Sequence, residues 1–248
     1  MSRPTRLPPP LAWLYTLYAY SLFLPVALLA LLCMLLLPTL RLRRTAARCA
    51  ARAWMALTGL RLAVHHRQRL PPGQCVVVAN HSSYLDGFVL SAVLPPRFGF
   101  VIKREMSRVP LANLLLSRLG SEFVERFDHH KGASDARRVV RSASNGHSLV
   151  FFPEGTFAQQ PGLLRFHGGA FRAAMHAGCP VVPCVIRGAR DALPPPGLLL
   201  HPTRIEVEFL PPLTAVDGAV EEASTALRDR ARREILAALG EPDLSQAA

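Results

Sequence analysis

Residues 75–86 read Cys75-Val-Val-Val-Ala-Asn-His-Ser-Ser-Tyr-Leu-Asp86, an apolar run that leads through a polar turn toward a helix. The apolar run predicts a buried strand. Ser83, with Asp86 three residues on, forms a capping-box-like pattern that predicts the start of a helix. His81 falls in the turn before that helix. A strand that leads into a helix is the repeating unit of α/β folds, so this stretch indicates the fold class.

The chain beyond about residue 61 continues this alternation of short apolar runs and helical patterns. The predicted strands are 75–79, 98–102, 122–125, 149–152, 181–186 and 205–209. The predicted helices are 84–93, 111–119, 134–143, 168–177 and 220–239, and a run of prolines predicts a loop at 193–197. Together they predict an α/β fold, with a mixed β-sheet flanked by helices.

The N-terminal part of the chain has a different character. Residues 11–40 are almost wholly apolar and carry no charge, which is long enough to cross a bilayer as a helix. Pro25, near the middle, is expected to kink this helix or to split it into a re-entrant pair. A signal peptide would be shorter and would not be followed by a basic cluster. The heavier positive charge follows the segment, which predicts that the rest of the chain lies in the cytoplasm.

Residues 41–60 predict a second helix, in which Arg44, Arg48 and Arg52 share one face. This pattern favours a basic helix lying on anionic lipid headgroups, and a packed helix with a solvated arginine face is the alternative. The expected organisation is therefore membrane-anchoring helices in 1–60, a catalytic domain in 61–215 and a C-terminal helix in 216–248. The predicted location is the inner (cytoplasmic) membrane.

The net charge of +12 is unevenly distributed, because no Asp or Glu occurs before Asp86. An anionic membrane or a nucleic acid would match such a basic region. The neighbouring apolar segment favours the membrane, and the absence of zinc-finger spacing or an aromatic RNA-binding block argues against nucleic acid. A genome rich in arginine codons would explain the arginine excess but not the acid-free run. The five cysteines form no C-x-x-C pair, which predicts free thiols in a reducing compartment and no zinc site.

His81 and Asp86 are the candidate catalytic pair. With His81 outside the helix, the turn can bring its ring against the Asp86 carboxylate, and a histidine oriented in this way is a general base for an alcohol. The spacing alone is weak, because His130 and Asp135 share it and are interpreted as solvated surface. A helix cap beside an incidental histidine is the alternative reading of His81 and Asp86.

A second strand that ends in a polar turn reads Leu149-Val-Phe-Phe-Pro-Glu154-Gly155-Thr156. Gly155 would let the backbone approach a ligand closely, while Glu154 and Thr156 offer an acceptor and a hydroxyl. Alone, this pattern is equally typical of an ordinary strand exit.

The two motifs together, in this order and spacing, resemble the lysophospholipid acyltransferase family, which includes the 1-acylglycerol-3-phosphate acyltransferases. Three further stretches carry the resemblance, which runs from about His65 to Gly188. They are residues 120–126, with Arg126 at the end, residues 166–170, and residues 181–188, an apolar strand broken by proline.

This resemblance implies transfer of an acyl chain from acyl-CoA or acyl-carrier protein to the free hydroxyl of lysophosphatidic acid. The product would be phosphatidic acid, made in phospholipid biosynthesis without a cofactor, a metal or an acyl-enzyme. His81 would take the hydroxyl proton and Asp86 would hold the imidazole. Arg126 would bind the acceptor phosphate, which suits a guanidinium fork.

The remaining site residues also follow from the resemblance. Glu154, Gly155 and Thr156 would complete the acceptor pocket, and backbone N–H groups near the start of the Ser83 helix would meet the oxyanion. Lys103 or Arg104 would assist, or else be surface charges.

Two departures from the family pattern leave the acceptor open. Phe157 and His167 stand where many members carry a basic residue. A different lysolipid, with an aminolipid or phosphate-free headgroup, is the alternative acceptor. A thioesterase would share the acyl chemistry, but it needs an activated serine, and no G-x-S-x-G motif occurs.

Overall fold

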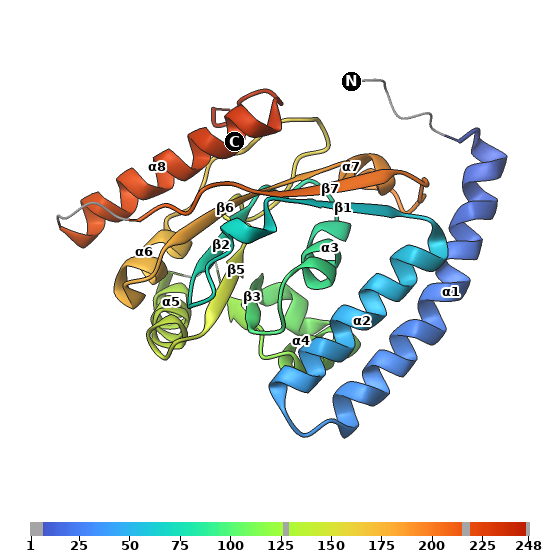
Figure 1. Cartoon of the computed structure of the whole chain (residues 1–248), viewed down its shortest axis with the longest axis horizontal. Helices are drawn as coiled ribbons and strands as arrows, with labels where there is room; N and C mark the ends of the chain where they lie inside the picture. The colour runs from blue at the N-terminus through green and yellow to red at the C-terminus, as the bar shows by residue number, and fades with distance from the viewer. Residues whose placement is uncertain (1–6, 126–128, 215–218, 247–248) are drawn as a thin grey trace.

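The computed structural model describes residues 7–125, 129–214 and 219–246 and contains a seven-stranded sheet (Figure 1). The strand order is β1-β7-β6-β2-β5-β3-β4. The strands are β1 (Arg61–His65), β2 (Val76–Ala79), β3 (Phe98–Lys103), β4 (Glu122–Val124), β5 (Ser148–Phe151), β6 (Val181–Arg187) and β7 (Arg204–Phe209). All neighbouring strands pair in parallel except β6 with β7. The predicted α/β class with a mixed sheet is confirmed.

The predicted strands are all present, and the sequence missed only β1 among those in the described residues. β1 is a half-exposed edge strand whose partner, β7, lies far along the chain, so its local pattern is weak. The centre of the sheet is clearer, because every residue of β2 and β5 is buried. Strands covered on both faces consist of continuous apolar runs, which explains why β2 and β5 could be predicted from the sequence.

Helices cover both faces of this sheet (Figure 1). The predicted helices are present as α3 (Leu85–Val93), α4 (Pro110–Arg118), α5 (His129–Ser144), α6 (Gly169–Ala177) and α8 (Val220–Leu239), and a short α7 (Ala189–Ala192) adds to them. Alternate residues of β2 point to opposite faces: Val77 and Ala79 join a core with α2 and α3, while Val76 and Val78 join a core with α5, α6 and α8.

Two local predictions are wrong. The N-cap of α3 is Tyr84, one residue later than predicted, although the Ser83 N–H still donates to Asp86 Oδ2 at 2.8 Å. Asp135 is not on a solvated surface, because it lies in α5 with only 1% of its area exposed. Arg104, which lies 31 residues earlier in the chain, covers this carboxylate, so local sequence could not reveal its burial.

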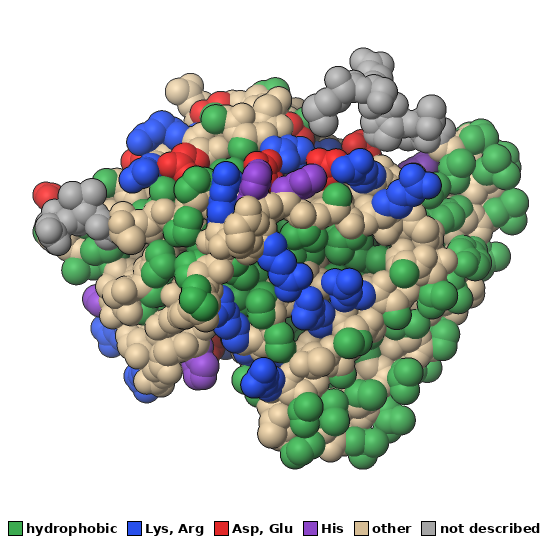
Figure 2. Space-filling view, in the orientation of Figure 1, with side chains coloured by type: hydrophobic (Ala, Val, Ile, Leu, Met, Phe, Trp, Pro, Cys, Tyr) green, Lys and Arg blue, Asp and Glu red, His purple; other side chains and the backbone are tan. Residues whose placement is uncertain are grey.

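The N-terminal helix α1 (Pro9–Leu36) packs side by side with α2 (Leu40–Thr58) on one flank of the molecule (Figure 1). α1 continues through Pro25, so the predicted split at this proline does not occur. It is long and apolar enough to cross a membrane, and 17% of its most apolar window is buried. Its outward side chains form a broad hydrophobic flank (Figure 2).

Polar contacts tie α1 to the rest of the molecule. The hydroxyl of Tyr15 donates to the Thr58 carbonyl at 2.9 Å, and the indole N–H of Trp54 donates to the Ala19 carbonyl at 2.9 Å. The hydroxyl of Tyr20 donates to the carbonyl of Leu198, in the proline-rich loop, at 3.1 Å. The helix is therefore docked along the domain rather than projecting away from it.

Two arginines on the shared face of α2 bond to the domain, so this face is not simply solvated, and its contact with lipid headgroups stays a prediction. Arg44 donates to the carbonyls of Leu119 and Arg97, each at 2.9 Å, and Arg48 donates to the carbonyl of Ala92 at 3.3 Å. These carbonyls belong to the ends of α3 and α4 and to the segment before β3. Carbonyls that no helix or strand uses need donors, and arginine supplies several on one fork. Arg52 alone of the three is exposed.

Candidate active site

The two polar motifs meet because β2 and β5 are neighbouring parallel strands. β2 leads into the turn that holds His81, and β5 leads into the turn that holds Glu154. The carboxyl ends of parallel strands lie at one edge of a sheet, where open α/β folds bind their ligands. The structure therefore brings together residues that are 73 positions apart.

His81 and Asp86 form the centre of this edge. His81 Nδ1 lies 2.9 Å from Asp86 Oδ2. The carboxylate is fully buried, whereas 20% of the His81 side chain is exposed. The same oxygen, Oδ2, accepts the backbone N–H groups of Ser82 at 2.6 Å and Ser83 at 2.8 Å, which fixes the carboxylate in place. Since a carboxylate accepts hydrogen bonds, Nδ1 carries the proton and Nε2 is the ring nitrogen left to act as a base.

Asn80 holds the start of this turn, a role that the sequence analysis missed. Its side-chain amide donates to the Ile186 carbonyl at 2.9 Å and accepts the Ile186 N–H at 2.7 Å. These two bonds tie the end of β2 to β6. Ser83 adds a third connection, because its hydroxyl donates to the Leu193 carbonyl at 2.9 Å. The sequence feature that could have indicated this role is an asparagine directly after a predicted buried strand.

Glu154 braces the turn from the other side. Its Oε1 accepts the backbone N–H of His81 at 2.6 Å, and its Oε2 accepts that of Leu164 at 2.8 Å. Burial raises the pKa of this carboxyl from 4.5 to about 7, and the Asp86 charge adds to the rise while the two N–H groups oppose it. Both oxygens are thus occupied by the main chain, so in this structure Glu154 positions His81 rather than facing an open pocket.

The neighbours of Glu154 lie differently. Gly155 adopts a φ of 77°, which favours glycine, and it lines the cavity described below. Thr156 is exposed. The sharp backbone turn at Gly155 is what lets the chain leave β5 and pass beside His81.

Aromatic rings surround His81. The Phe152 ring stacks on the imidazole with centroids 4.4 Å apart, and the Phe157 ring meets its edge at 4.7 Å. Tyr84 packs edge-on against Phe157 at 4.9 Å. These contacts lock the orientation of the imidazole and give it apolar walls. From the sequence, Phe157 was seen only as a departure from the family pattern. The type of a residue does not reveal which side chains it will pack against.

The predicted basic and oxyanion groups are only partly in place. Lys103 is exposed at the end of β3, and Arg126 lies outside the described residues. Arg104 is bound to Asp135, so it is held as an ion pair. The backbone N–H groups of Ser82 and Ser83 are engaged by Asp86, so they are not left for an oxyanion. Within the described ranges, no three His, Cys, Asp or Glu side chains are grouped so that they could hold a metal ion.

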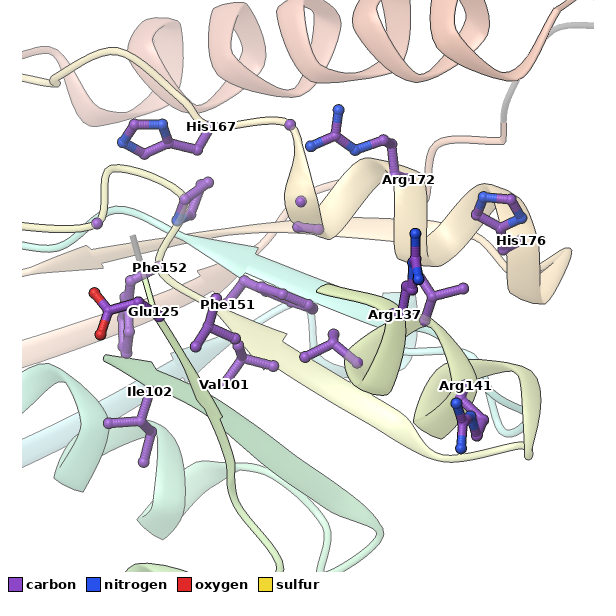
Figure 3. Close-up of a pocket in the computed structure, with 18 of the residues that line it drawn as sticks. Val101, Ile102, Glu125, Arg137, Arg141, Phe151, Phe152, His167, Arg172 and His176 are labelled. Carbon is purple, nitrogen blue, oxygen red and sulfur yellow. The ribbon is translucent and has the colours of Figure 1, made fainter. Parts of the chain in front are cut away.

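A cavity of about 800 Å³ adjoins this site (Figure 3). It lies between β3, β4 and β5 on one side and α5 and α6 on the other, and its lining includes Phe152 and Gly155. The sheet side is apolar, with Val101, Val124 and Phe151, while the helices contribute basic side chains. Phe152 therefore contacts the His81 ring and also lines the cavity.

The sequence matches the Acyltransferase family over residues 61–187, just over half of the chain. The chain belongs to the Acyltransferase family. The resemblance predicted from the motifs is thereby confirmed at the level of the family. The acyltransferase region runs from the start of β1 to the end of β6 and contains His81, Asp86 and Glu154.

Individual relatives of this chain agree with the family match. It is 32% identical to 1-acyl-sn-glycerol-3-phosphate acyltransferase alpha of Bos taurus over 182 residues, which is 73% of this chain and 63% of that protein. It is 29% identical to the 1-acyl-sn-glycerol-3-phosphate acyltransferase of Neisseria gonorrhoeae over 68% of this chain and 71% of that protein. The match therefore spans less than two thirds of the bovine relative.

The fold also has a counterpart among solved structures. The 1-acyl-sn-glycerophosphate acyltransferase PlsC of Thermotoga maritima superposes with a TM-score of 0.74, covering 91% of this chain and 95% of that one. The sequences are 20% identical, so this likeness establishes a shared fold. At 91% of this chain, it extends beyond the family match over residues 61–187.

Proposed function

We propose that this protein is an O-acyltransferase that moves a fatty acyl chain from an acyl thioester to the free hydroxyl of lysophosphatidic acid, forming phosphatidic acid. The thioester would be acyl-CoA or acyl-carrier protein. The observation that carries the proposal is the 2.9 Å contact between His81 Nδ1 and the buried Asp86 carboxylate at the ligand-binding edge of the sheet. The bovine and Neisseria relatives are 1-acyl-sn-glycerol-3-phosphate acyltransferases, which supports the same acceptor.

The proposed reaction uses Nε2 of His81 as a general base. Nε2 takes the proton of the acceptor hydroxyl while the hydroxyl oxygen attacks the thioester carbonyl carbon. The carbon–sulfur bond then breaks, and the departing thiolate receives the proton from the imidazolium. Asp86 stabilises the imidazolium that forms between these two steps and keeps the proton-bearing Nδ1 in place. The products are the new ester and the free thiol, so atoms and charges balance.

The aromatic walls and the Glu154 brace contribute by position. Phe152 and Phe157 restrict the His81 ring, and Glu154 holds the His81 backbone. Excluding water from the imidazole favours attack by the lipid hydroxyl over hydrolysis. Arg126 and Lys103 are proposed for the acceptor phosphate, and Gly155 and Thr156 for the rest of the acceptor pocket.

A lysolipid without a phosphate is the second candidate acceptor. The observation that favours it is the apolar ring of Phe157, which packs 4.7 Å from the His81 ring, beside the point where the acceptor hydroxyl must approach. A phosphate next to that hydroxyl would lose hydration against an aromatic wall. An amino or neutral headgroup would not carry this penalty to the same extent.

We further propose that the hydrophobic flank of α1 lies in the cytoplasmic membrane, with the catalytic domain on its cytoplasmic side. Exposed large side chains along this flank include Trp13, Leu17, Leu24 and Leu28, whose burial in lipid would be favourable. Such a placement would bring the site to the surface from which a lysolipid must be drawn.

The test supplies detergent-purified protein with labelled acyl-CoA and lysophosphatidic acid, and compares wild type with His81→Ala. His147→Ala is the matched control, because His147 is exposed and far from the site along the fold, at the opposite end of β5. Phosphatidic acid should form with wild type and the control but not with His81→Ala. Full activity in His81→Ala would refute the mechanism.

The same assay with a panel of substrates separates the alternatives. A phosphate-free or amino lysolipid used in preference to lysophosphatidic acid would replace the acceptor while keeping the chemistry. Release of free fatty acid at the same rate with and without any acceptor would identify a thioesterase instead. Acyl-carrier protein replaces acyl-CoA in a parallel series to identify the donor.

A further inference from the structure

The cavity beside His81 has a basic end that the proposed chemistry does not use. Arg137 and Arg141 are one helical turn apart on α5, so they share a face, and Arg172 of α6 also lines the cavity (Figure 3). His176 and Arg141 lie at the end of the cavity away from Phe152 (Figure 3). From Gly169 to His176 the α6 wall is about 10 Å long.

These arginines are not used to hold the fold together. In the part of the chain that the structure describes, neither Arg137 nor Arg141 forms an ion pair through its side chain, and Arg172 forms one, at 3.5 Å with the exposed Glu221. The neighbouring Arg138 differs, because it pairs with Asp135 at 3.1 Å and with Glu122 at 3.0 Å. The unpaired guanidinium groups of Arg137 and Arg141, which line one cavity, are suited to an anion.

The rest of the lining is arranged for an amphipathic ligand. Apolar residues form the floor along the sheet, among them Val101, Val124 and Phe151, and Val139 of α5 adds to them. Glu125, the acidic residue of the lining, lies near Phe152 and away from Arg141 (Figure 3). A ligand would therefore place its anionic part at the far end and an uncharged, partly apolar part toward His81.

The position of the charges distinguishes the two substrates. In lysophosphatidic acid, the phosphate and the reacting hydroxyl sit on adjacent carbons of glycerol. A phosphate bound near Arg141 would therefore keep that hydroxyl away from His81. In an acyl thioester donor, a long pantetheine arm separates the phosphate from the thioester. Only the donor can reach the basic end and the His81 end at once.

We propose that this cavity binds the phosphopantetheine arm of the acyl donor, with its phosphate on Arg137, Arg141 and Arg172. The arm would run over the apolar floor and present the thioester beside Phe152 and Gly155. This inference rests on the proposed acyl transfer and adds the donor site to it. Acyl-CoA and acyl-carrier protein both carry this arm, so the chemistry is shared by the two sources.

A binding experiment tests the site without depending on the acceptor. Calorimetry on the detergent-purified full chain compares CoA, 4′-phosphopantetheine and pantetheine, using wild type and the double variant Arg137→Gln/Arg141→Gln. Loss of two charge-assisted contacts should weaken CoA and 4′-phosphopantetheine about tenfold or more, and pantetheine should change little. Equal affinity of wild type and the double variant for CoA would overturn the proposal.

Controls separate charge from folding. Arg233→Gln, on an exposed arginine of α8 outside the cavity, should bind CoA like wild type. Arg137→Lys/Arg141→Lys keeps the charge and should recover most of the lost affinity. Both double variants should keep the wild-type thermal midpoint, because these arginines are exposed and make no described ion pair.

Steady-state kinetics add the directional test. In the double glutamine variant, KM for the donor should rise about tenfold while KM for the acceptor stays within about twofold. A rise confined to the acceptor would assign the cavity to the lysolipid and overturn the proposal. Holo- and apo-acyl-carrier protein distinguish the sources: arginine-dependent binding of the holo form supports the carrier protein, and binding of CoA alone supports the coenzyme.

The two proposals can fail separately. Arginine-dependent binding of CoA by a protein that leaves every lysolipid unacylated would retain the arm site and reject the proposed acceptor chemistry. Phosphatidic acid formation with an unchanged donor KM in the double variant would retain the proposed acyl transfer and reject the arm site.

Discussion

Two histidine–aspartate pairs with the same spacing, His81 with Asp86 and His130 with Asp135, place their aspartates in very different surroundings. Both carboxylates are buried. Asp86 faces the imidazole of His81 and two backbone N–H groups, whereas Asp135 faces the guanidinium groups of Arg104 and Arg138 and the N–H of Glu125. The first arrangement orients the His81 imidazole, and the second joins α5 to the end of β3.

The difference comes from what precedes each pair. A buried strand leads to His81, so the histidine is delivered to the ligand-binding edge and Asp86 begins a helix behind it. His130 lies within the first turn of α5 instead, on the same continuous helix as Asp135. The five-residue spacing between histidine and aspartate therefore indicates a candidate site only when a buried strand and a turn precede it.

The largest effect should separate the two histidines. Replacing His81 by alanine removes the proposed general base, and acyl transfer should fall roughly 10³-fold. His130→Ala should keep wild-type activity, because it leaves the edge of β2 untouched. Initial rates of acyl transfer measure both, and similar losses in the two variants would show that the shared spacing rather than the strand defines the site.

Asp86→Asn should give the next largest effect. The amide removes the charge that stabilises the imidazolium and no longer fixes Nδ1 as the protonated nitrogen. The rate should therefore fall roughly 10²-fold, at the low end of the range for general acid–base catalysis. The pH–rate profile is the informative measurement, because the apparent pKa of the base should drop when the neighbouring carboxylate is neutralised. An unchanged profile would mean that Asp86 acts only on the fold.

Glu154 extends the comparison to a third buried carboxyl. Its oxygens accept backbone N–H groups, whereas Asp135 accepts from the Arg104 guanidinium. Its pKa rises from 4.5 to about 7 through burial, so the folded protein binds the proton more tightly than the unfolded chain. Stability should therefore be highest below pH 4.5 as far as this group is concerned and decline toward pH 7, by at most about 3 kcal/mol. Thermal unfolding across this range should show a shallower slope in Glu154→Gln than in wild type. The exposed Glu222→Gln should keep the wild-type slope.

Asp135→Asn should give the smallest effect. Burial alone would raise the pKa of Asp135, but the hydrogen bond from Arg104, the Glu125 N–H and the charge of Arg138 bring it below its ordinary value. The carboxylate thus stabilises the fold above about pH 4, and its contribution is lost as the pH falls through the lowered pKa. Because both arginines are more than a third exposed, the substitution should cost only about 1–2 kcal/mol near neutral pH. Specific activity of the folded protein should remain near wild type, and a catalytic loss like that of Asp86→Asn would contradict the comparison.

The sequence was sufficient for the parts that depend on local pattern. The buried β2 and β5 read as apolar runs, and the turn between His81 and Asp86 follows from five residues. The braces were not predictable, because Asn80 pairs with Ile186, which is 106 residues away, and Glu154 holds the backbone of His81 from 73 residues away. Such side-chain-to-backbone bonds depend on which strands become neighbours.

The arginines show the same limit. Helical spacing correctly placed Arg44, Arg48 and Arg52 on one face of α2, but it could not say what that face meets. Helix ends that approach α2 supply carbonyl acceptors for Arg44 and Arg48, and these acceptors exist only once α3 and α4 have packed. Likewise, the cavity and its arginines arise from the packing of α5 against α6, which no single motif reports.

The docking of α1 has a practical consequence for anyone who wishes to handle this protein in water. Trp54 and Met55 of α2 belong to the same core as the inner face of the sheet, and Ala19 of α1 is part of it. Deleting the first helix would expose that core to water. It would also remove the Ala19 carbonyl that accepts the Trp54 indole N–H. A chain shortened to begin at Leu40 should therefore aggregate instead of giving a detergent-free enzyme. Because α1, α2 and the sheet share one hydrophobic core, the helix cannot be removed without disrupting the rest of the fold.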